Sequence, residues 1–217
     1  EPVPDDANFA RSPAFLNFLH PTNSTTTALL QQLRQFELPP SIYQGSAVLL
    51  NWASQSAAPL GLFAVQNGQT GGGSGKRRRE DAGAVLQALQ SQAANLQQVA
   101  AAAARFNAFQ TSTNRDANAV FHPASEPILV LERLHLLFQA RACALLAFDR
   151  NEEAAADILT GLHLVRLARQ LPDTRSTFRV QLLLARSLQP LWEGLNQRVW
   201  TEPQLAAFQR ELGGFPL

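Results

Sequence analysis

One stretch of the chain decides its fold class: residues 126–171 read EPILVLERLHLLFQARACALLAFDRNEEAAADILTGLHLVRLARQL. Apolar side chains recur there at three- and four-residue steps, as they do on one face of an α-helix. In the first half, the predicted buried face comprises Leu131, Leu134, Phe138, Ala142, Leu145 and Phe148. In the second half, it comprises Ala155, Leu159, Leu162 and Val165. The pattern predicts two helices, each with one side against a core.

The residues between these two runs predict a tight connection. Asp149 and Arg150 end the first run, and Asn151 is a residue type that caps helix N-termini. Glu152 and Glu153 would then complement the positive end of the helix dipole. Helices joined by so short a connection usually pack as antiparallel neighbours. We therefore expect an antiparallel hairpin, similar in shape to a tetratricopeptide unit.

The residues after Pro172 predict a second hairpin. A third helix would contain Pro190, whose missing N–H is expected to bend it. Residues 201–204 (TEPQ) match a capping box with proline in the first turn, and Gly213 and Gly214 are expected to end the last helix. The predicted buried residues of the third helix are Phe178, Leu182, Leu188, Leu191, Trp192 and Leu195. The predicted fold class is all-α: an irregular bundle of antiparallel hairpins with a tetratricopeptide-like carboxy-terminal part.

The first half of the chain is less regular. Residues 1–23 are rich in proline and are expected to form an extended lead-in arm that lays Phe9, Phe15, Leu16, Phe18 and Leu19 across the core. Residues 24–217 are expected to form one helical domain, with a mobile Gly- and Arg-rich loop near 67–79. A long helix is predicted from Glu80 through Phe106. Its expected buried line is Leu86, Leu89, Ala93, Leu96, Val99, Ala103 and Phe106.

Composition limits the class of protein. A chain of 217 residues with 46% hydrophobic content is sufficient for a sizeable core. Its net charge of +1 provides no global attraction to nucleic acid or to an anionic membrane. The single cysteine, Cys143, lies among apolar residues and is expected to be buried. No run reaches the roughly 18 apolar residues of a membrane span, so any anchor is expected upstream of Glu1.

Several segments resemble a family of uncharacterised bacterial proteins. They are residues 145–159 (LLAFDRNEEAAADIL), 188–195 (LQPLWEGL) and 200–205 (WTEPQL), together with the opening 2–10 (PVPDDANFA) and the helix at 89–106. In that family, an amino-terminal membrane helix precedes an all-helical extracytoplasmic region. The resemblance implies a helical region in the periplasm or elsewhere outside the cytoplasm, held to the membrane by an upstream anchor. It implies no activity and no catalytic residue.

A basic segment, Lys76-Arg77-Arg78-Arg79, is one candidate binding site. Its charges could contact the phosphates of nucleic acid or anionic lipid. However, Glu80 and Asp81 adjoin it and no aromatic side chains interleave for base stacking, so a solvated loop is favoured. The glycines before it imitate a phosphate-binding P-loop, but Thr70 and Arg77 stand where that motif requires glycine and a hydroxyl residue.

A second candidate is the Glu132-x-x-His135 motif, which has the spacing of a di-iron ligand pair. His163 lies beyond the Asn151 turn, so the two histidines could face each other. The full di-iron site needs a second Glu-x-x-His motif and two further glutamates, and no second copy of the motif exists. Trp192 and Trp200 could form an aromatic face for a partner, although helical spacing usually places tryptophan in a core.

Because no ligand constellation is complete, the sequence favours a non-catalytic scaffold or protein-interaction module with protein partners. It indicates no cofactor, no small-molecule substrate and no catalytic residue. The candidate partner-binding residues are Lys76, Arg77, Arg78, Arg79, Trp192 and Trp200. Two alternatives stay open: a metal-binding helical protein centred on Glu132, His135 and His163, and binding of nucleic acid or anionic lipid through Lys76 to Arg79.

Overall fold

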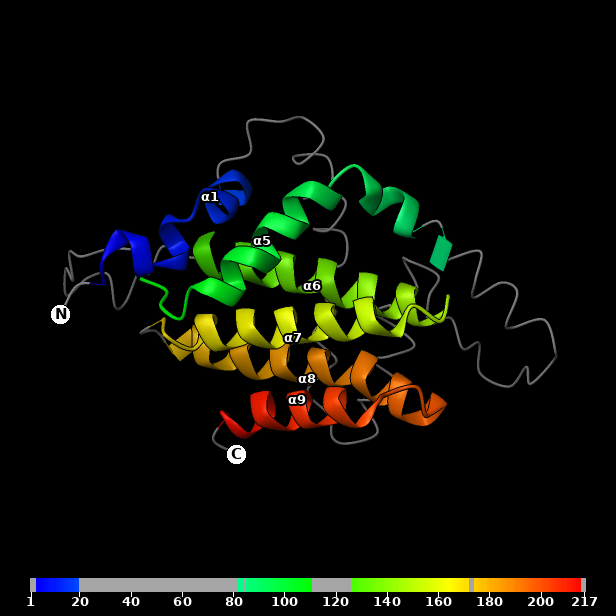
Figure 1. The fold of residues 1–217 in the computed structure, drawn as a ribbon. Coiled ribbons are helices and arrows are strands. Elements are labelled where there is room, and N and C mark those ends of the chain that lie inside the picture. The colour runs from blue at the N-terminus through cyan, green and yellow to red at the C-terminus, as the bar shows by residue number, and fades with distance from the viewer. Residues whose placement is uncertain (1–2, 20–81, 84, 111–125, 172–173, 216–217) are drawn as a thin grey trace.

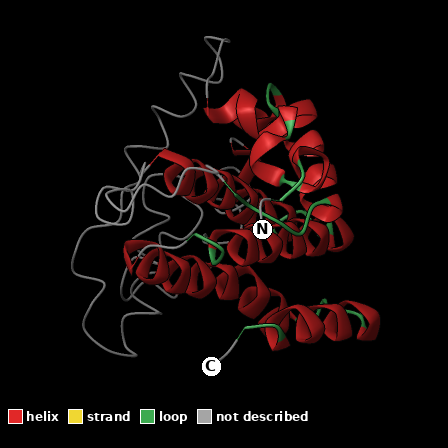
Figure 2. Ribbon diagram, turned by 90° about the vertical axis from the view of Figure 1, so that its left-hand side faces the viewer, coloured by secondary structure: helices red, strands yellow, loops and turns green. Residues whose placement is uncertain are grey.

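The protein is all-α over the residues described by this computed structural model, which are 3–19, 82–83, 85–110, 126–171 and 174–215. Four helices follow one another in the carboxy-terminal half: α6 (Glu126–Leu146), α7 (Asn151–Ala168), α8 (Thr174–Gln197) and α9 (Glu202–Gly213). Helix α6 packs against α7 and α8, and α9 packs against α7, while α1 (Pro13–Leu19) contacts α6 and α5 (Ala93–Arg105) contacts α7 (Figure 1). Figure 2 shows the same helices in a view turned by 90°. Within these ranges the structure contains no strand, so the predicted all-α class is confirmed.

Helix α6 buries the face that its sequence predicts. Leu131, Leu134, Phe138, Ala142 and Leu145 all lie in the hydrophobic core. Phe148 is an exception, because it is 38% exposed. The regular helix ends at Leu146, so Phe148 no longer follows the helical phase that would place it under the preceding residues. Its prediction as a core residue was wrong.

The α6–α7 connection is closed by backbone hydrogen bonds. The N–H of Arg150 donates to the carbonyl of Leu145 at 3.0 Å, and Asp149 adopts a left-handed conformation with φ 61°. This is the pattern of a Schellman motif, which satisfies carbonyl groups at a helix C-terminus. The motif places Arg150 at the N-cap of α7, without a side-chain cap bond, and Asn151 inside the helix. The predicted Asn151 cap is therefore wrong, because the chain reverses one residue earlier than the cap requires.

Helix α7 is more central than its sequence suggests. It packs against α5, α6, α8 and α9. Ten of its residues are consequently buried, including both sides of the predicted stripe: Ala154, Ala155, Asp157, Ile158, Gly161, Leu162, Leu164, Val165, Leu167 and Ala168. The prediction of a single buried face was too narrow, since a helix with neighbours on several sides has few solvent-facing positions.

The buried face of helix α8 differs from the one that the sequence predicts. Leu188, Trp192 and Leu195 are 37%, 64% and 40% exposed, although the sequence predicts them in the core. The buried side of α8 instead combines Val180 and Leu183 with four residues that the stripe omits: Arg186, Ser187, Gln189 and Pro190. Leu182 and Leu191 are partly buried, and the side chain of Phe178 lies outside the described residues. The cause is that the facing side of α6 presents Glu132, His135 and Gln139, which select polar partners.

The junction between α8 and α9 is built around Gly194. The N–H of Val199 donates to the Gly194 carbonyl at 3.1 Å, and Arg198 adopts a left-handed conformation with φ 57°. The chain then returns Trp200 onto α8, where its indole N–H donates to the Leu191 carbonyl at 2.9 Å. Trp200 is therefore buried, as its spacing predicts.

The predicted capping box at the start of α9 is confirmed. The side-chain carbonyl of Gln204 accepts a hydrogen bond from the Thr201 N–H at 2.9 Å. Pro203 lies in the first turn, where no intrahelical donor is required. Gly214 is the C-cap residue, as expected for the end of this helix.

Replacement of Arg198 by glycine is expected to raise the free energy of unfolding. A non-glycine residue in the left-handed region costs about 1 kcal/mol, and Arg198 is exposed with φ 57°. We expect Arg198→Gly to stabilise the protein by about 0.5–1 kcal/mol in urea unfolding. Arg198→Ala, which removes the same side chain but keeps the backbone restriction, is the control. Equal stability of the two variants would contradict the prediction.

The amino-terminal segment is helical rather than an extended arm. It forms two 3₁₀ turns, Asp5–Ala7 and Phe9–Arg11, and then α1. Its predicted contact with the core is confirmed for Phe9, Phe15 and Phe18, which are buried, while Leu16 is 36% exposed. Phe9 and Phe15 pack with Phe109, at ring-centroid distances of 6.3 and 5.3 Å.

A turn at Ser91 and Gln92 divides the helix that the sequence predicts from Glu80 to Phe106. Residues 82–83 and 85–90 are helical, and α5 begins after Gln92. The buried line keeps three- and four-residue steps through the turn, from Leu89 to Gln92 to Leu96, so Gln92 is buried and Ala93, a predicted core residue, is exposed. Leu89, Leu96, Val99 and Ala103 are buried as expected.

Several predicted features lie outside the described residues. They are the Gly- and Arg-rich loop near 67–79, the basic residues Lys76, Arg77, Arg78 and Arg79, and the P-loop-like positions Thr70 and Arg77. Cys143 lies within the described part and is buried, as predicted. Among the helices that can be described, none has the length and apolarity needed to cross a membrane.

Candidate functional site

The α6–α8 interface contains a polar cluster, which we define as Glu132, His135, Arg179, Arg186 and Ser187. His135, Arg186 and Ser187 are buried, Glu132 is partly buried, and the side chain of Arg179 is 38% exposed. Glu132 and His135 are one turn apart on α6, so they lie on the same face of the helix. The other three residues belong to α8. Sequence analysis singled out Glu132 and His135 but missed their partners. The seven-residue spacing of Arg179 and Arg186 was the available signal, because it places both on one face of α8.

Glu132 is the acceptor for both arginines of the cluster. Arg186 Nη1 donates to Glu132 Oε1 at 3.0 Å, and Arg179 Nη1 donates to Glu132 Oε2. Arg186 is only 2% exposed. Its burial lowers the pKa of its guanidinium, and the negative charge of Glu132 opposes that shift. Glu132 is therefore the counter-charge that makes the buried guanidinium tolerable.

His135 has a defined tautomer in this cluster. His135 Nε2 lies 2.7 Å from Ser187 Oγ, and Ser187 Oγ donates its proton to the Leu183 carbonyl at 3.1 Å. A hydroxyl has one proton, so the two hydrogen bonds of Ser187 form together only when Ser187 accepts from an Nε2–H group of His135. This direction is opposite to that of a serine nucleophile, which donates its proton to histidine. The pair is thus not arranged for nucleophilic catalysis.

The polar contacts continue along the interface. Gln139 Nε2 on α6 donates to Gln189 Oε1 on α8 at 3.4 Å, and Gln189 Nε2 donates to Glu193 Oε1 at the same distance. Matched polar groups therefore run along much of the contact between α6 and α8. They explain why α8 turns polar residues inward and Leu188, Trp192 and Leu195 outward.

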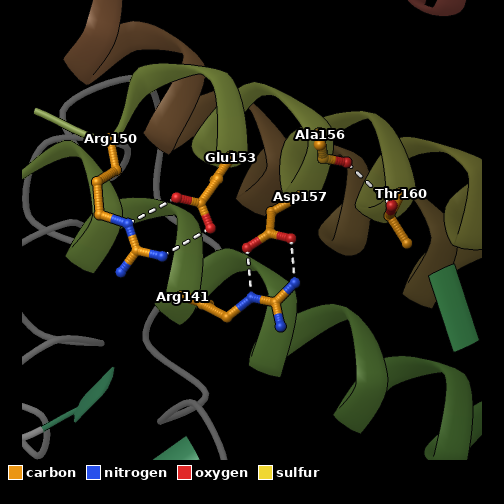
Figure 3. Close-up of polar contacts among 6 residues, drawn as sticks. All are labelled: Arg141, Arg150, Glu153, Ala156, Asp157 and Thr160. Carbon is orange, nitrogen blue, oxygen red and sulfur yellow. Dashed lines mark hydrogen bonds and ion pairs between the residues drawn. The ribbon is translucent and has the colours of Figure 1, made fainter. Parts of the chain in front are cut away.

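A second ionic contact joins α6 to α7 (Figure 3). Arg141 Nε and Nη2 donate to the two carboxylate oxygens of Asp157 at 2.7 and 2.5 Å. Burial raises the pKa of Asp157, and the hydrogen bonds from Arg141 act in the opposite direction. The same hydrogen bonds raise the pKa of Arg141. Because both carboxylate oxygens are engaged by one guanidinium, this pair fixes the register of the hairpin.

The structure does not bring Glu132, His135 and His163 together as metal ligands. His163 Nε2 lies 3.0 Å from the carbonyl of Phe106, whereas Glu132 and His135 are bonded to residues of α8. Within the described ranges, no group of three His, Cys, Asp or Glu side chains could hold a metal ion. The sequence-based metal site is thus replaced by three separate sets of protein contacts.

The two tryptophans do not form one aromatic face. Trp200 packs against Phe208 of α9 with ring centroids 5.2 Å apart, whereas Trp192 is exposed. Trp192 lies instead between Leu188 and Leu195, four residues after the first and three before the second. These three residues form an exposed line that we call the α8 apolar face. The exposed residues Gln181, Asn196 and Gln197 of α8 are uncharged, whereas Glu193, beside Trp192, and Arg198, directly after the helix, are charged.

The buried histidine predicts a specific loss of stability in acid. Burial lowers the pKa of His135 from 6.5 to about 3, and the positive charge of Arg186 adds to the shift. His135 is therefore protonated below about pH 6.5 in the unfolded chain but only below about pH 3 in the folded chain. Stability due to neutral His135 is present above pH 6.5 and is lost as the pH falls towards 3.

We expect the stability advantage of the wild type over His135→Gln to shrink by roughly 3 kcal/mol between pH 7 and pH 4. Urea unfolding of both proteins at a series of pH values measures this difference. His163→Gln is the control, since that variant keeps His135. An advantage of the wild type over His135→Gln that does not change with pH would show that His135 is not buried as a neutral group.

Comparison of the chain with protein-family models, with curated proteins and with solved structures finds no match in any of the three. Neither a family nor a structural relative therefore assigns a function to the polar cluster or to the α8 apolar face.

Proposed function

We propose that this protein is a non-catalytic interaction module whose α8 apolar face contacts a protein partner. The observation that carries the proposal is the exposure of Trp192, 64%, between two exposed leucines on a rigid helix. Tryptophan is enriched among residues that dominate the energy of protein interfaces. Depletion of charge is a further property of interface centres, and the three residues of the face itself are uncharged.

The arrangement of helices supports a stacked-hairpin architecture of the tetratricopeptide type. α6 packs against both α7 and α8, and α7 packs against both α8 and α9. Stacked helical hairpins make these contacts, because each hairpin covers the next. In such a stack the helices present extended surfaces for partners, and these surfaces need no catalytic residues.

The chemistry of the polar cluster supports a structural role rather than catalysis. Glu132 is engaged by two arginines, Ser187 directs its proton to a backbone carbonyl, and His135 is neutral and buried. None of these groups is poised to transfer a proton to a substrate. The resemblance to an anchored bacterial family further supports an extracytoplasmic location with an upstream membrane anchor, as part of the same proposal.

Site-specific photo-crosslinking tests the proposed interface. A photoreactive amino acid at position 192 is expected to capture a specific protein in the native cells, and the same group at exposed position 152 on α7 is the matched control. The captured protein would then be purified and titrated against the wild type and Trp192→Ser. We expect the substitution to weaken binding about tenfold or more. Equal binding by the two proteins, or equal capture from both positions, would overturn the proposal.

A further inference from the structure

Two buried polar atoms of the α6–α8 cluster have no hydrogen-bond partner within the part of the chain that the structure describes. They are His135 Nδ1 and Arg186 Nε, in residues that are 1% and 2% exposed. Arg186 Nε carries a proton and is a donor. His135 Nδ1 is an acceptor, because the Nε2–H group donates to Ser187. One unpaired donor and one unpaired acceptor therefore occur in the same cluster.

The hydrogen bonds of the cluster bring the side chains of His135 and Arg186 to neighbouring turns of the α6–α8 interface. His135 is bonded to Ser187, which follows Arg186 directly, and Arg186 is bonded to Glu132, one turn before His135. The Cδ2 and Nε2 edge of the imidazole faces Gly161 of α7. Nδ1 lies on the opposite edge of the ring.

Leaving each of these atoms unpaired would cost about 1–3 kcal/mol. Buried polar groups without a protein partner are commonly satisfied by an enclosed water molecule. The combination of a donor and an acceptor also selects the ligand. An anion would be repelled by the Nδ1 lone pair, and a cation would be repelled by the guanidinium. A neutral molecule that can both accept and donate fits the two atoms.

We propose that one enclosed water molecule bridges His135 Nδ1 and Arg186 Nε between α6 and α8. It accepts from the Arg186 Nε–H group and donates to His135 Nδ1. Arg186 is bonded to Glu132, and His135 is bonded to Ser187. The water joins these two parts, so all five members of the cluster belong to one hydrogen-bonded unit.

Water–protein NMR on the ¹⁵N-labelled whole chain tests the proposal. We expect a cross-peak between the Arg186 Nε–H proton and a long-lived water in the wild type. His135→Asn keeps an acceptor near the Nδ1 position, whereas His135→Gln keeps the reach to Ser187 but loses that acceptor. The cross-peak is expected to persist in His135→Asn and to fall at least severalfold in His135→Gln.

Three results would overturn the proposal. The first is a folded wild type without the water cross-peak, which decides the question even where a variant fails to fold. The second is a cross-peak of full intensity in His135→Gln. The third is a crystal structure of the wild type, grown with bromide, that shows an anion or a direct Nε–H···Nδ1 hydrogen bond at this position. Water density between the two atoms in that crystal would support it.

Discussion

Replacement of Glu132 by glutamine is expected to lower the free energy of unfolding by about 3–5 kcal/mol. The substitution keeps the size and shape of the side chain but removes the counter-charge of Arg186, which is 2% exposed. An arginine cannot shed its proton to escape burial, so the charge stays in the core without compensation. Urea unfolding at pH 7, followed by circular dichroism, measures the loss.

The exposed pair Arg150–Glu153 is the matched control for this prediction. Its carboxylate also accepts two guanidinium hydrogen bonds, although both come from one arginine: Arg150 Nε and Nη2 donate to Glu153 at 2.6 and 2.7 Å (Figure 3). Its side chains are 50% and 58% exposed, so water replaces the lost contact. We expect Glu153→Gln to cost less than about 1 kcal/mol. Equal costs for the two substitutions would contradict the assignment of Glu132 as the counter-charge of the buried Arg186.

A double substitution separates the charge effect from general loss of packing. Arg186→Met removes the buried guanidinium and keeps much of its aliphatic volume. If the cost of Glu132→Gln comes from an uncompensated charge, then Glu132→Gln with Arg186→Met is expected to be less destabilised than the sum of the single variants. Strict additivity would mean that the two side chains do not interact across α6 and α8.

Replacement of Gly194 by alanine is the second large expected effect, a loss of about 3 kcal/mol. A Cβ atom at Gly194 would lie 2.1 to 2.4 Å from three ring atoms of Trp200, far closer than atoms can pack. The indole would have to leave its site, which breaks its hydrogen bond to Leu191 and its contact with Phe208. The α8–α9 junction depends on both contacts.

The same substitution at Gly161 is not expected to lower the free energy of unfolding. It also lies in a helix interior, but a Cβ there would meet His135 Cδ2 at 3.5 Å, an ordinary contact distance. Glycine in a helix is less favourable than alanine by about 0.5–1 kcal/mol. Gly161→Ala is therefore expected to be neutral or slightly stabilising. Thermal and urea unfolding of the two variants compare them, and similar losses for both would show that Trp200 does not occupy the space beside Gly194.

The carboxy-terminal helices could be predicted closely because their signals are local. The apolar repeat of α6, the acidic first turn of α7 and the capping box before α9 each depend on residues a few positions apart. The all-α class follows from these repeats. Local patterns do not predict the exact residue at which a helix begins or ends. At Asn151, for example, the Schellman motif places the N-cap one residue earlier. The turn at Gln92 is a similar case.

The candidate sites were predicted less well, because each depends on the identity of a spatial neighbour. Glu132 and His135 have the spacing of metal ligands, but α8 supplies Arg186 and Ser187 as their partners. Those partners are about fifty residues away in the chain, and no local pattern connects them. The orientation of Trp192 has the same cause, since the buried side of α8 follows the polar face of α6.

The sequence by itself determined that this protein is a set of antiparallel helical hairpins, because helix periodicity and end signals are encoded within a few residues. Only the tertiary structure decided which face of α8 is buried and what Glu132 and His135 contact. The hydrophobic effect favours the burial of Leu188, Trp192 and Leu195, but a partly buried carboxylate and a buried imidazole need polar partners. The facing helix therefore turns arginine and serine inward and leaves its apolar line in solvent.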